Sequence, residues 1–241
     1  MSMSMPESGA AHAALPPTQV ASVRAQILAT EHWSLLATRS MTWSEVMSRI
    51  VIHLTVLSAG LVVLALLAQA QGFGRAFQVL SIGLAAVALV LGTLTGLRVY
   101  NASDDDAAML IGMNRLRNAY VDLDPGMEPY LVTSRYDDAA GLSASYLMGR
   151  RRSTASHVLA STGMFVTVVN AIVAGTLGGL IALAAEAPVW LIAVIGAVSS
   201  LAYLAATIAI AARRFGSNSI ESRFPSPGQP LPSERATPAT R

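Results

Sequence analysis

Long apolar runs, interrupted by short polar segments, set the pattern of this chain. Two charge-poor runs lie between Ile50 and Leu97, joined by a short turn at 71–75, and a second pair follows Arg152. Runs of about 20 apolar residues cross the hydrocarbon core of a bilayer as α-helices. The pattern predicts an all-α, multi-pass membrane protein with four transmembrane helices in two hairpins. The predicted spans cover residues of about 50–68, 77–97, 158–183 and 189–211.

Helical patterning continues outside the first hairpin. Residues 19–41 carry a loose apolar stripe, which predicts either a helix lying on the membrane or a cytoplasmic helix packed on other helices. Thr42 and Glu45 have the spacing of a capping box, so a new helix is expected to begin at Thr42, with Trp43 at the level of the lipid headgroups. Beyond the second span the helical period persists to Tyr120, which predicts a helix that projects out of the membrane.

Turn-forming residues divide the remainder of the chain. Asp124, Pro125 and Gly126 predict the end of the projecting helix, and Gly141 is expected to break the mixed segment that follows. Both ends of the chain are rich in small and polar residues and proline, which favours disorder. The predicted organisation is a disordered tail at 1–18, a helix at 19–41, a transmembrane hairpin at 42–100, a cytoplasmic helical segment at 101–152, a second hairpin at 153–214 and a disordered tail at 215–241.

The distribution of arginine predicts the orientation in the membrane. All 16 basic residues are arginine, and all of them except Arg75 fall in segments that the four-span pattern places on one side. Positively charged loops stay in the cytoplasm, so both termini are expected there. Arg150, Arg151 and Arg152 stand directly before the third span, where they are expected to set topology or to contact anionic lipid headgroups.

Composition excludes several kinds of chemistry. The chain has no cysteine, so thiolate catalysis, disulfides and zinc–cysteine sites are ruled out. Metalloprotease, phosphate-loop and dinucleotide-binding motifs are missing, and the sequence from Gly141 to Ser145 lacks the last glycine of a nucleophile elbow. The sequence therefore predicts a non-enzymatic protein with no metal, no cofactor and no nucleic-acid partner.

Stripes of small and weakly polar residues run along three of the spans. Helices in lipid associate through such residues, so packing is the ordinary interpretation and lining of a pore is the alternative. The glycines expected to pack helices are Gly92, Gly96, Gly175 and Gly179. The polar members of the stripes, which are the pore candidates, are Thr167, Asn170, Ser200 and Tyr203.

Two further groups could carry ion chemistry. His53 is the one strongly ionisable residue within a predicted span, and ionisable groups inside a membrane are functional candidates by default. A neutral histidine that bonds a neighbouring helix is the alternative. Asp104, Asp105 and Asp106 follow the second span and could concentrate cations at a channel mouth, although pairing with nearby arginines is the simpler interpretation.

Three segments resemble a known but uncharacterised family. Residues 31–43 (EHWSLLATRSMTW), 112–120 (GMNRLRNAY) and 128–130 (EPY) are similar to an actinobacterial family of four-span integral membrane proteins. The resemblance implies a bacterial inner (plasma) membrane location and carries no activity. The first half is also similar in outline to two-span effector domains of bacterial defence systems. Two functions are consistent with these observations: a homo-oligomeric channel or membrane effector, and a scaffold subunit whose cytoplasmic helices bind a partner protein.

Overall fold

The computed structural model describes residues 16–148, 160–215 and 221–228, and every regular element in these ranges is helical. Four helices in these ranges are long and apolar enough to cross a membrane, which confirms the prediction of an all-α chain with four such helices. The elements are α1 (Pro17–Gln71), α2 (Arg75–Leu123), the 3₁₀ helix η1 (Pro125–Tyr130), α3 (Ala139–Leu147), α5 (Thr162–Ala184) and α6 (Val189–Phe215).

The first helix is far longer than a membrane span. With 55 residues, α1 is about 80 Å long, whereas a bilayer core needs about 30 Å. The predicted helix start at Thr42 is wrong, because the Thr42 hydroxyl donates to the carbonyl of Thr38, 3.0 Å away, inside a continuous helix. No proline or glycine interrupts the stretch between Pro17 and Gly60, so nothing in the backbone ends the helix there.

The turn between α1 and α2 depends on glycine. Gly72 has φ 71° and donates its N–H to the carbonyl of Ala68, which closes the end of α1. A side chain at this φ would be strained, and glycine is not. Arg75 then starts α2, which continues without a break through the predicted second span to Leu123. The predicted projection of this helix beyond the apolar span is confirmed, and so is its end at Asp124, whose side chain accepts from the N–H of Gly126 at 2.9 Å.

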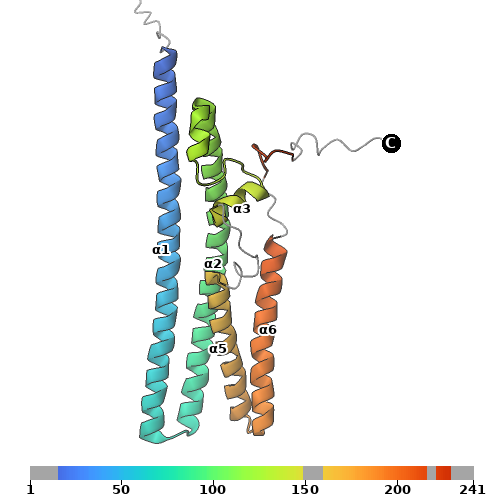
Figure 1. Cartoon of the computed structure of the whole chain (residues 1–241). Coiled ribbons are helices and arrows are strands. Elements are labelled where there is room, and N and C mark those ends of the chain that lie inside the picture. The colour runs from blue at the N-terminus through green and yellow to red at the C-terminus, as the bar shows by residue number, and fades with distance from the viewer. Residues whose placement is uncertain (1–15, 149–159, 216–220, 229–241) are drawn as a thin grey trace, which may run out of the picture.

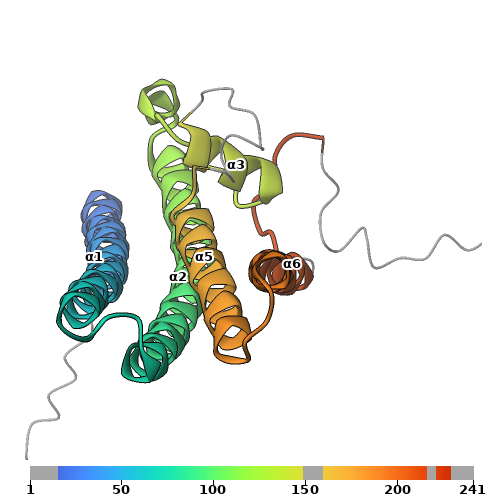
Figure 2. The same cartoon turned by 90° about the horizontal axis from the view of Figure 1, so that it is seen from below.

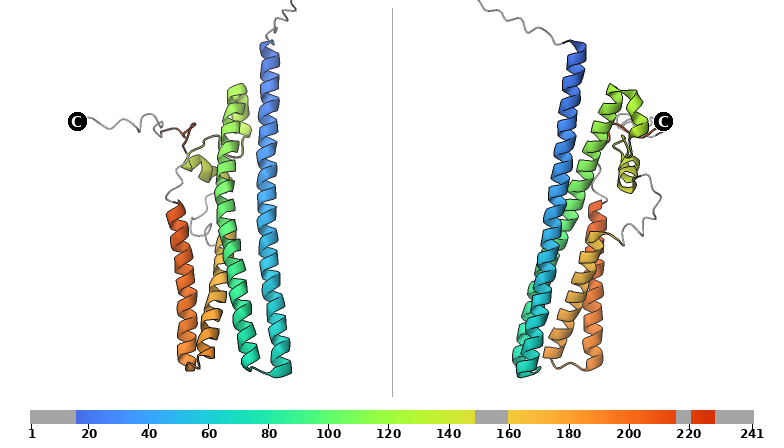
Figure 3. Two further views of the ribbon diagram at one scale, coloured as in Figure 1. Left: turned by 180° about the vertical axis from the view of Figure 1, so that it is seen from behind. Right: turned by 60° about the vertical axis from the view of Figure 1, so that its left-hand side comes forward.

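The membrane-length helices form an open row and not a closed bundle. In this row α1 packs on α2, α2 on α5, and α5 on α6, so that α1 and α6 lie at opposite edges (Figure 2). The two long helices continue together beyond the shorter α5–α6 pair, and the described ends of the chain lie at that same end (Figures 1 and 3). We call this extension, residues 17–49 of α1 with residues 98–123 of α2, the stalk.

A small apolar core joins the stalk to the row of four helices. Its side chains come from α1, α2 and α5, and they are buried where the third helix begins to pack on the first two. The core consists of Val46, Ile50, Val99, Ala102 and Val166, with Trp43 and Leu54 packed against it. Near the tip of the stalk, the ring of Tyr120 stacks on His32 and its hydroxyl donates to the carbonyl of Leu28 at 3.0 Å. The two helices are thus held together at both ends of the stalk.

Two other predictions about this end of the protein are wrong. Gly141 does not break a helix, because it lies in the first turn of α3, where its N–H donates to the side chain of Asp138. The C-terminal tail is not disordered throughout, because residues 221–228 are bound to the segment before α3 by hydrogen bonds to Asp137 and Asp138. Arg150, Arg151 and Arg152 lie outside the described residues.

Candidate functional site in the membrane layer

Three helices meet at Gly92 of α2. A Cβ atom at this position would overlap Oδ1 of Asn170 from α5 and would come within 2.7 Å of Cε1 of His53 from α1. The missing side chain therefore makes room for two polar side chains at once. We call His53, Gly92 and Asn170 the polar junction. The sequence singled out each of the three, and the structure brings them together.

The polar junction is buried within the apolar span. His53 is 2% exposed and Asn170 is 1% exposed. In the described part of the chain, no partner lies in good hydrogen-bond geometry for either ring nitrogen of His53 or for Oδ1 of Asn170. The amide of Asn170 is nevertheless close enough to the imidazole to interact with it, so the two side chains can satisfy one polar atom each, and one ring nitrogen of His53 then still lacks a partner. In proteins most buried polar atoms are hydrogen-bonded, so such a cluster is unusual. The cluster can donate and accept hydrogen bonds toward a group that is not part of this chain.

Polar contacts at neighbouring levels extend the junction to the fourth helix. The Tyr203 hydroxyl of α6 lies 3.0 Å from Oγ1 of Thr93, and the Tyr100 hydroxyl of α2 lies 3.1 Å from Oγ1 of Thr167. Each threonine hydroxyl donates to a carbonyl in its own helix, so each accepts from the tyrosine. All four membrane-length helices therefore contribute a polar side chain close to the level of Gly92 along the row. Of the predicted pore candidates, Ser200 is the exception, because it faces Gly175 at the α5–α6 contact.

Charged side chains mark the stalk side of this layer. Glu45 accepts from Arg49 at 2.8 Å and from Arg98 at 2.7 Å, and these hydrogen bonds lower the pKa of the exposed Glu45 carboxyl. His53 follows Arg49 by four residues, and Gly92 precedes Arg98 by six, which places the junction roughly 6–9 Å inside this boundary. The junction thus lies one to two helical turns from the aqueous side of the stalk.

The predicted glycine positions lie at contacts within the chain. Gly96 is one turn from Gly92 and has room for a methyl group beside Val166. At the α5–α6 contact, a Cβ at Gly175 would come within 2.8 Å of the carbonyl oxygen of Gly196. Gly179 is less crowded, with its nearest neighbour 3.7 Å away on Ile192. These contacts show how the glycines pack helices within one protomer.

Asp106, one of the predicted cation ligands, is instead the centre of a hydrogen-bond network that joins α1, α2 and α3 and that we call the hub. It is 1% exposed, and its carboxylate accepts from Nε of Arg39 at 2.5 Å, from Nε1 of Trp43 at 2.8 Å and from the Tyr146 hydroxyl at 2.9 Å. Burial alone would raise the pKa of Asp106, but the hydrogen bonds from Arg39, Trp43 and Tyr146 outweigh it, and the net shift is downward. The indole N–H of Trp43 therefore points toward α2.

The other two predicted cation ligands do not converge with Asp106. Asp105 is exposed and lies 3.5 Å from Arg98, and Asp104 is half-buried one residue earlier. No group of three histidines or acidic residues in the described ranges could hold a metal ion. The hub residues Arg39, Trp43 and Tyr146 were not predicted, because a partner dozens of residues away leaves no local sequence pattern.

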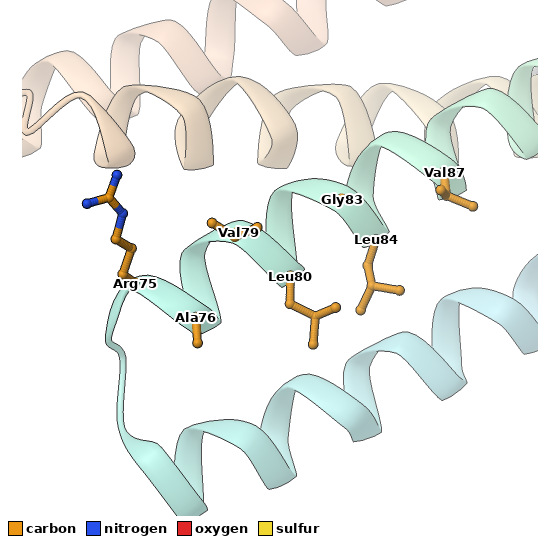
Figure 4. A pocket seen from close by; sticks show the side chains of 7 residues that line it. All are labelled: Arg75, Ala76, Val79, Leu80, Gly83, Leu84 and Val87. Carbon is orange, nitrogen blue, oxygen red and sulfur yellow. The ribbon is translucent and has the colours of Figure 1, made fainter.

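A groove on the surface of α2 is apolar. It has a volume of about 700 Å³, lies at the end of the row away from the stalk, and is lined by α2 alone. Figure 4 shows Leu80 and Leu84 pointing toward α1, while Arg75 points the other way. Its lining residues are Arg75, Ala76, Val79, Leu80, Gly83, Leu84 and Val87. With one polar residue at its rim, the groove suits lipid chains and offers little to a polar ligand.

Comparisons with known proteins leave the polar junction as the main guide to function. No protein-family model matches the chain, and the searches of curated proteins and of solved structures gave no match. The described residues form an all-helical protein with four helices that are long and apolar enough to cross a membrane, and with a buried polar junction between three of them.

Proposed function

We propose that this protein is a non-enzymatic membrane protein whose copies associate into a channel or a membrane effector. The observation that carries the proposal is the polar junction, in which at least one buried polar atom lacks a partner in the described part of the chain. Leaving a buried donor or acceptor unpaired costs about 1–3 kcal/mol, so packing alone does not account for such a cluster. Polar and ionisable groups inside a membrane commonly mark the path of an ion, a proton or water.

The open row of helices supports assembly from several copies. A row in which α1 and α6 lie at opposite edges does not enclose a pore by itself. None of the residues in the most apolar part of α6 is buried by the described chain, so this helix is free to pack on a neighbouring copy. In such an assembly His53 and Asn170 would face, or brace, the half of the pathway nearest the stalk.

The stalk is proposed to lie in the cytoplasm of a bacterial cell, with the protein in the inner membrane. The arginine distribution supports this orientation, because Arg75 alone is assigned to the far side. Reporter domains fused at Gly72 and at Glu186 should then report an external location. A cytoplasmic signal at either turn would reverse or break the topology.

Ion flux tests the proposal. Purified protein in liposomes should conduct at least one of H⁺, Na⁺, K⁺ or Cl⁻, and His53→Phe and Asn170→Leu should each change the rate or its pH dependence without preventing insertion. Thr55→Val is the matched control, because Thr55 is an exposed residue of the same helix whose hydroxyl bonds its own backbone. If the variants conduct like the wild type, the junction has no role in conduction.

A scaffold is the second candidate function, and a feature of the stalk favours it. The Tyr120 contact with Leu28 lies close to the end of α2, so the first turns of α1 extend beyond it (Figure 1). This part of α1 exposes apolar side chains, including Val20 (49%), Val23 (41%) and Ile27 (63%). An exposed apolar helix face of this kind fits a partner helix. Absence of flux for every common ion would favour this function over conduction.

A further inference from the structure

The C-terminal segment from Glu221 to Gly228 is held by a buried carboxylate. Asp137 is 1% exposed and accepts from the Ser222 hydroxyl at 2.7 Å and from the backbone N–H groups of Arg223 and Phe224 at 2.9 and 2.7 Å. The backbone N–H of Asp137 in turn donates to the carbonyl of Phe224 at 3.1 Å. Asp137 therefore recognises the course of the backbone as well as one hydroxyl.

A second carboxylate holds the other end of the segment. Asp138 is 6% exposed, and it accepts from the backbone N–H of Ser226 at 2.7 Å and from the Ser226 hydroxyl at 3.0 Å. The same carboxylate caps α3 by accepting from the N–H of Gly141 at 2.7 Å. Its position is thus fixed by the helix start and does not depend on the segment it binds.

Arg115 connects this pair of carboxylates to the stalk. Its Nε donates to Asp137 at 2.7 Å, and its Nη2 donates to the carbonyl of Glu221 at 2.9 Å. The segment begins six residues after the end of α6, and it contacts a side chain of α2. It therefore attaches the end of α6, which otherwise packs mainly on α5, to the long helix of the stalk.

The contacts have the character of peptide recognition and not of a hydrophobic core. Phe224 is 38% exposed, and the segment is held chiefly by hydrogen bonds from its backbone and from two serine hydroxyls. An ionised carboxylate can accept hydrogen bonds but cannot donate them. A negatively charged group at Ser226 would lose its donor and would be repelled by Asp138.

We propose that Arg115, Asp137 and Asp138 form a binding site for an extended peptide that carries serines four residues apart. The chain's own Ser222–Ser226 stretch is its resident ligand, and negative charge at Ser226 releases it. Release would detach the end of α6 from the stalk. This inference is independent of whether the protein conducts ions.

Trypsin cleavage after Arg223 measures release in the full-length chain. In the wild type the hydrogen-bonded backbone should resist cleavage, and Ser226→Glu should speed it by at least about tenfold, because cleavage follows the population of the released state. Ser226→Gln separates size from charge and should give a smaller increase. Ser143→Glu adds the same charge on an exposed face of α3 and should leave cleavage unchanged. Adding Asp138→Asn to Ser226→Glu should restore part of the protection.

A labelled peptide of residues 221–228 tests the site directly. It should bind the full-length Ser226→Glu protein, whose own segment is released, and the same peptide phosphorylated on Ser226 should bind at least about tenfold more weakly, a difference of one charge-assisted contact. Equal cleavage of wild type and Ser226→Glu would overturn the role of charge at Ser226. Failure of the unmodified peptide to bind a Ser226→Glu protein that has released its segment would overturn the binding site itself.

Discussion

Replacing Gly92 by alanine tests the packing that creates the polar junction. The added methyl group would overlap Oδ1 of Asn170 and would lie 2.7 Å from both Cγ of Asn170 and Cε1 of His53. His53 and Asn170 are both short side chains that are almost fully buried, so neither can simply swing away from the added methyl group. The change therefore requires α1, α2 and α5 to move apart or both polar side chains to change rotamer.

The expected cost follows from two opposing effects. Glycine to alanine in a helix gains about 0.5–1 kcal/mol from lower backbone entropy in the unfolded chain. Overpacking of a tightly filled site costs about 1–3 kcal/mol. We expect Gly92→Ala to lose about 1–2 kcal/mol net, with a matching fall in the midpoint of thermal unfolding. Combining it with Asn170→Ala should cost less than the sum of the two single changes, because the second change removes the overlap.

Thermal unfolding in detergent, followed by circular dichroism, measures this difference. Gly83→Ala is the matched control, since a Cβ at Gly83 meets no atom within 4 Å and the variant should be at least as stable as the wild type. Gly96→Ala should be tolerated, because its nearest neighbour would be 3.7 Å away. Gly92→Ala as stable as Gly83→Ala would refute the three-helix meeting at this position.

Three further outcomes follow from the described contacts. Asp106→Asn should lower the free energy of unfolding by about 2–3 kcal/mol in the same assay, because a buried carboxylate loses charge-assisted hydrogen bonds; an unchanged midpoint would remove it as a hub. Gly175→Leu should destabilise the α5–α6 pair and remove the cooperative thermal unfolding transition, whereas Gly179→Ala should leave this transition unchanged. A Gly175→Leu protein with a normal transition and an altered oligomeric state would contradict the intramolecular contact. Acid should release the C-terminal segment. Burial raises and hydrogen bonds lower the pKa of Asp137 and Asp138, with a net decrease, so their stabilisation is complete above the ordinary value of 3.8 and is lost as pH falls through the lower folded-state pKa. Deuterium exchange of the Arg223, Phe224 and Ser226 backbone N–H groups, compared with the intrinsic rate at each pH, should show this loss of protection, and unchanged protection in acid would contradict it.

The sequence predicts the membrane helices well because their pattern is local. Apolar composition over about 20 residues decides the spans, and glycine or proline decides the turns at Gly72 and Asp124. The failed helix start at Thr42 shows the limit of a local motif, since a capping box competes with an uninterrupted helical backbone and here the backbone prevails.

The candidate site could be predicted residue by residue but not as an arrangement. His53 and Asn170 attract attention because polar side chains are rare in spans. Their meeting at Gly92 depends on the register between three helices separated by up to 117 positions, which no short pattern specifies. The C-terminal binding site shows the same limit. Asp138 stands directly before Ala139 and Ala140, a position that indicates a helix cap, but nothing in this local pattern indicates the distant segment that Asp138 also binds.

Accessibility of the polar junction to water tests the central proposal most directly. The natural chain has no cysteine, so Asn170→Cys is the single thiol in the protein. In liposomes, a membrane-impermeant thiol reagent added on the stalk side should modify this cysteine. Thr176→Cys, at an exposed position of the same helix outside the polar junction, should stay unmodified. If the reagent modifies the Asn170→Cys protein and leaves the Thr176→Cys protein unmodified, the polar junction lies on a water-filled pathway. Equal protection of both positions, in a protein that retains its helical content, would contradict the pathway.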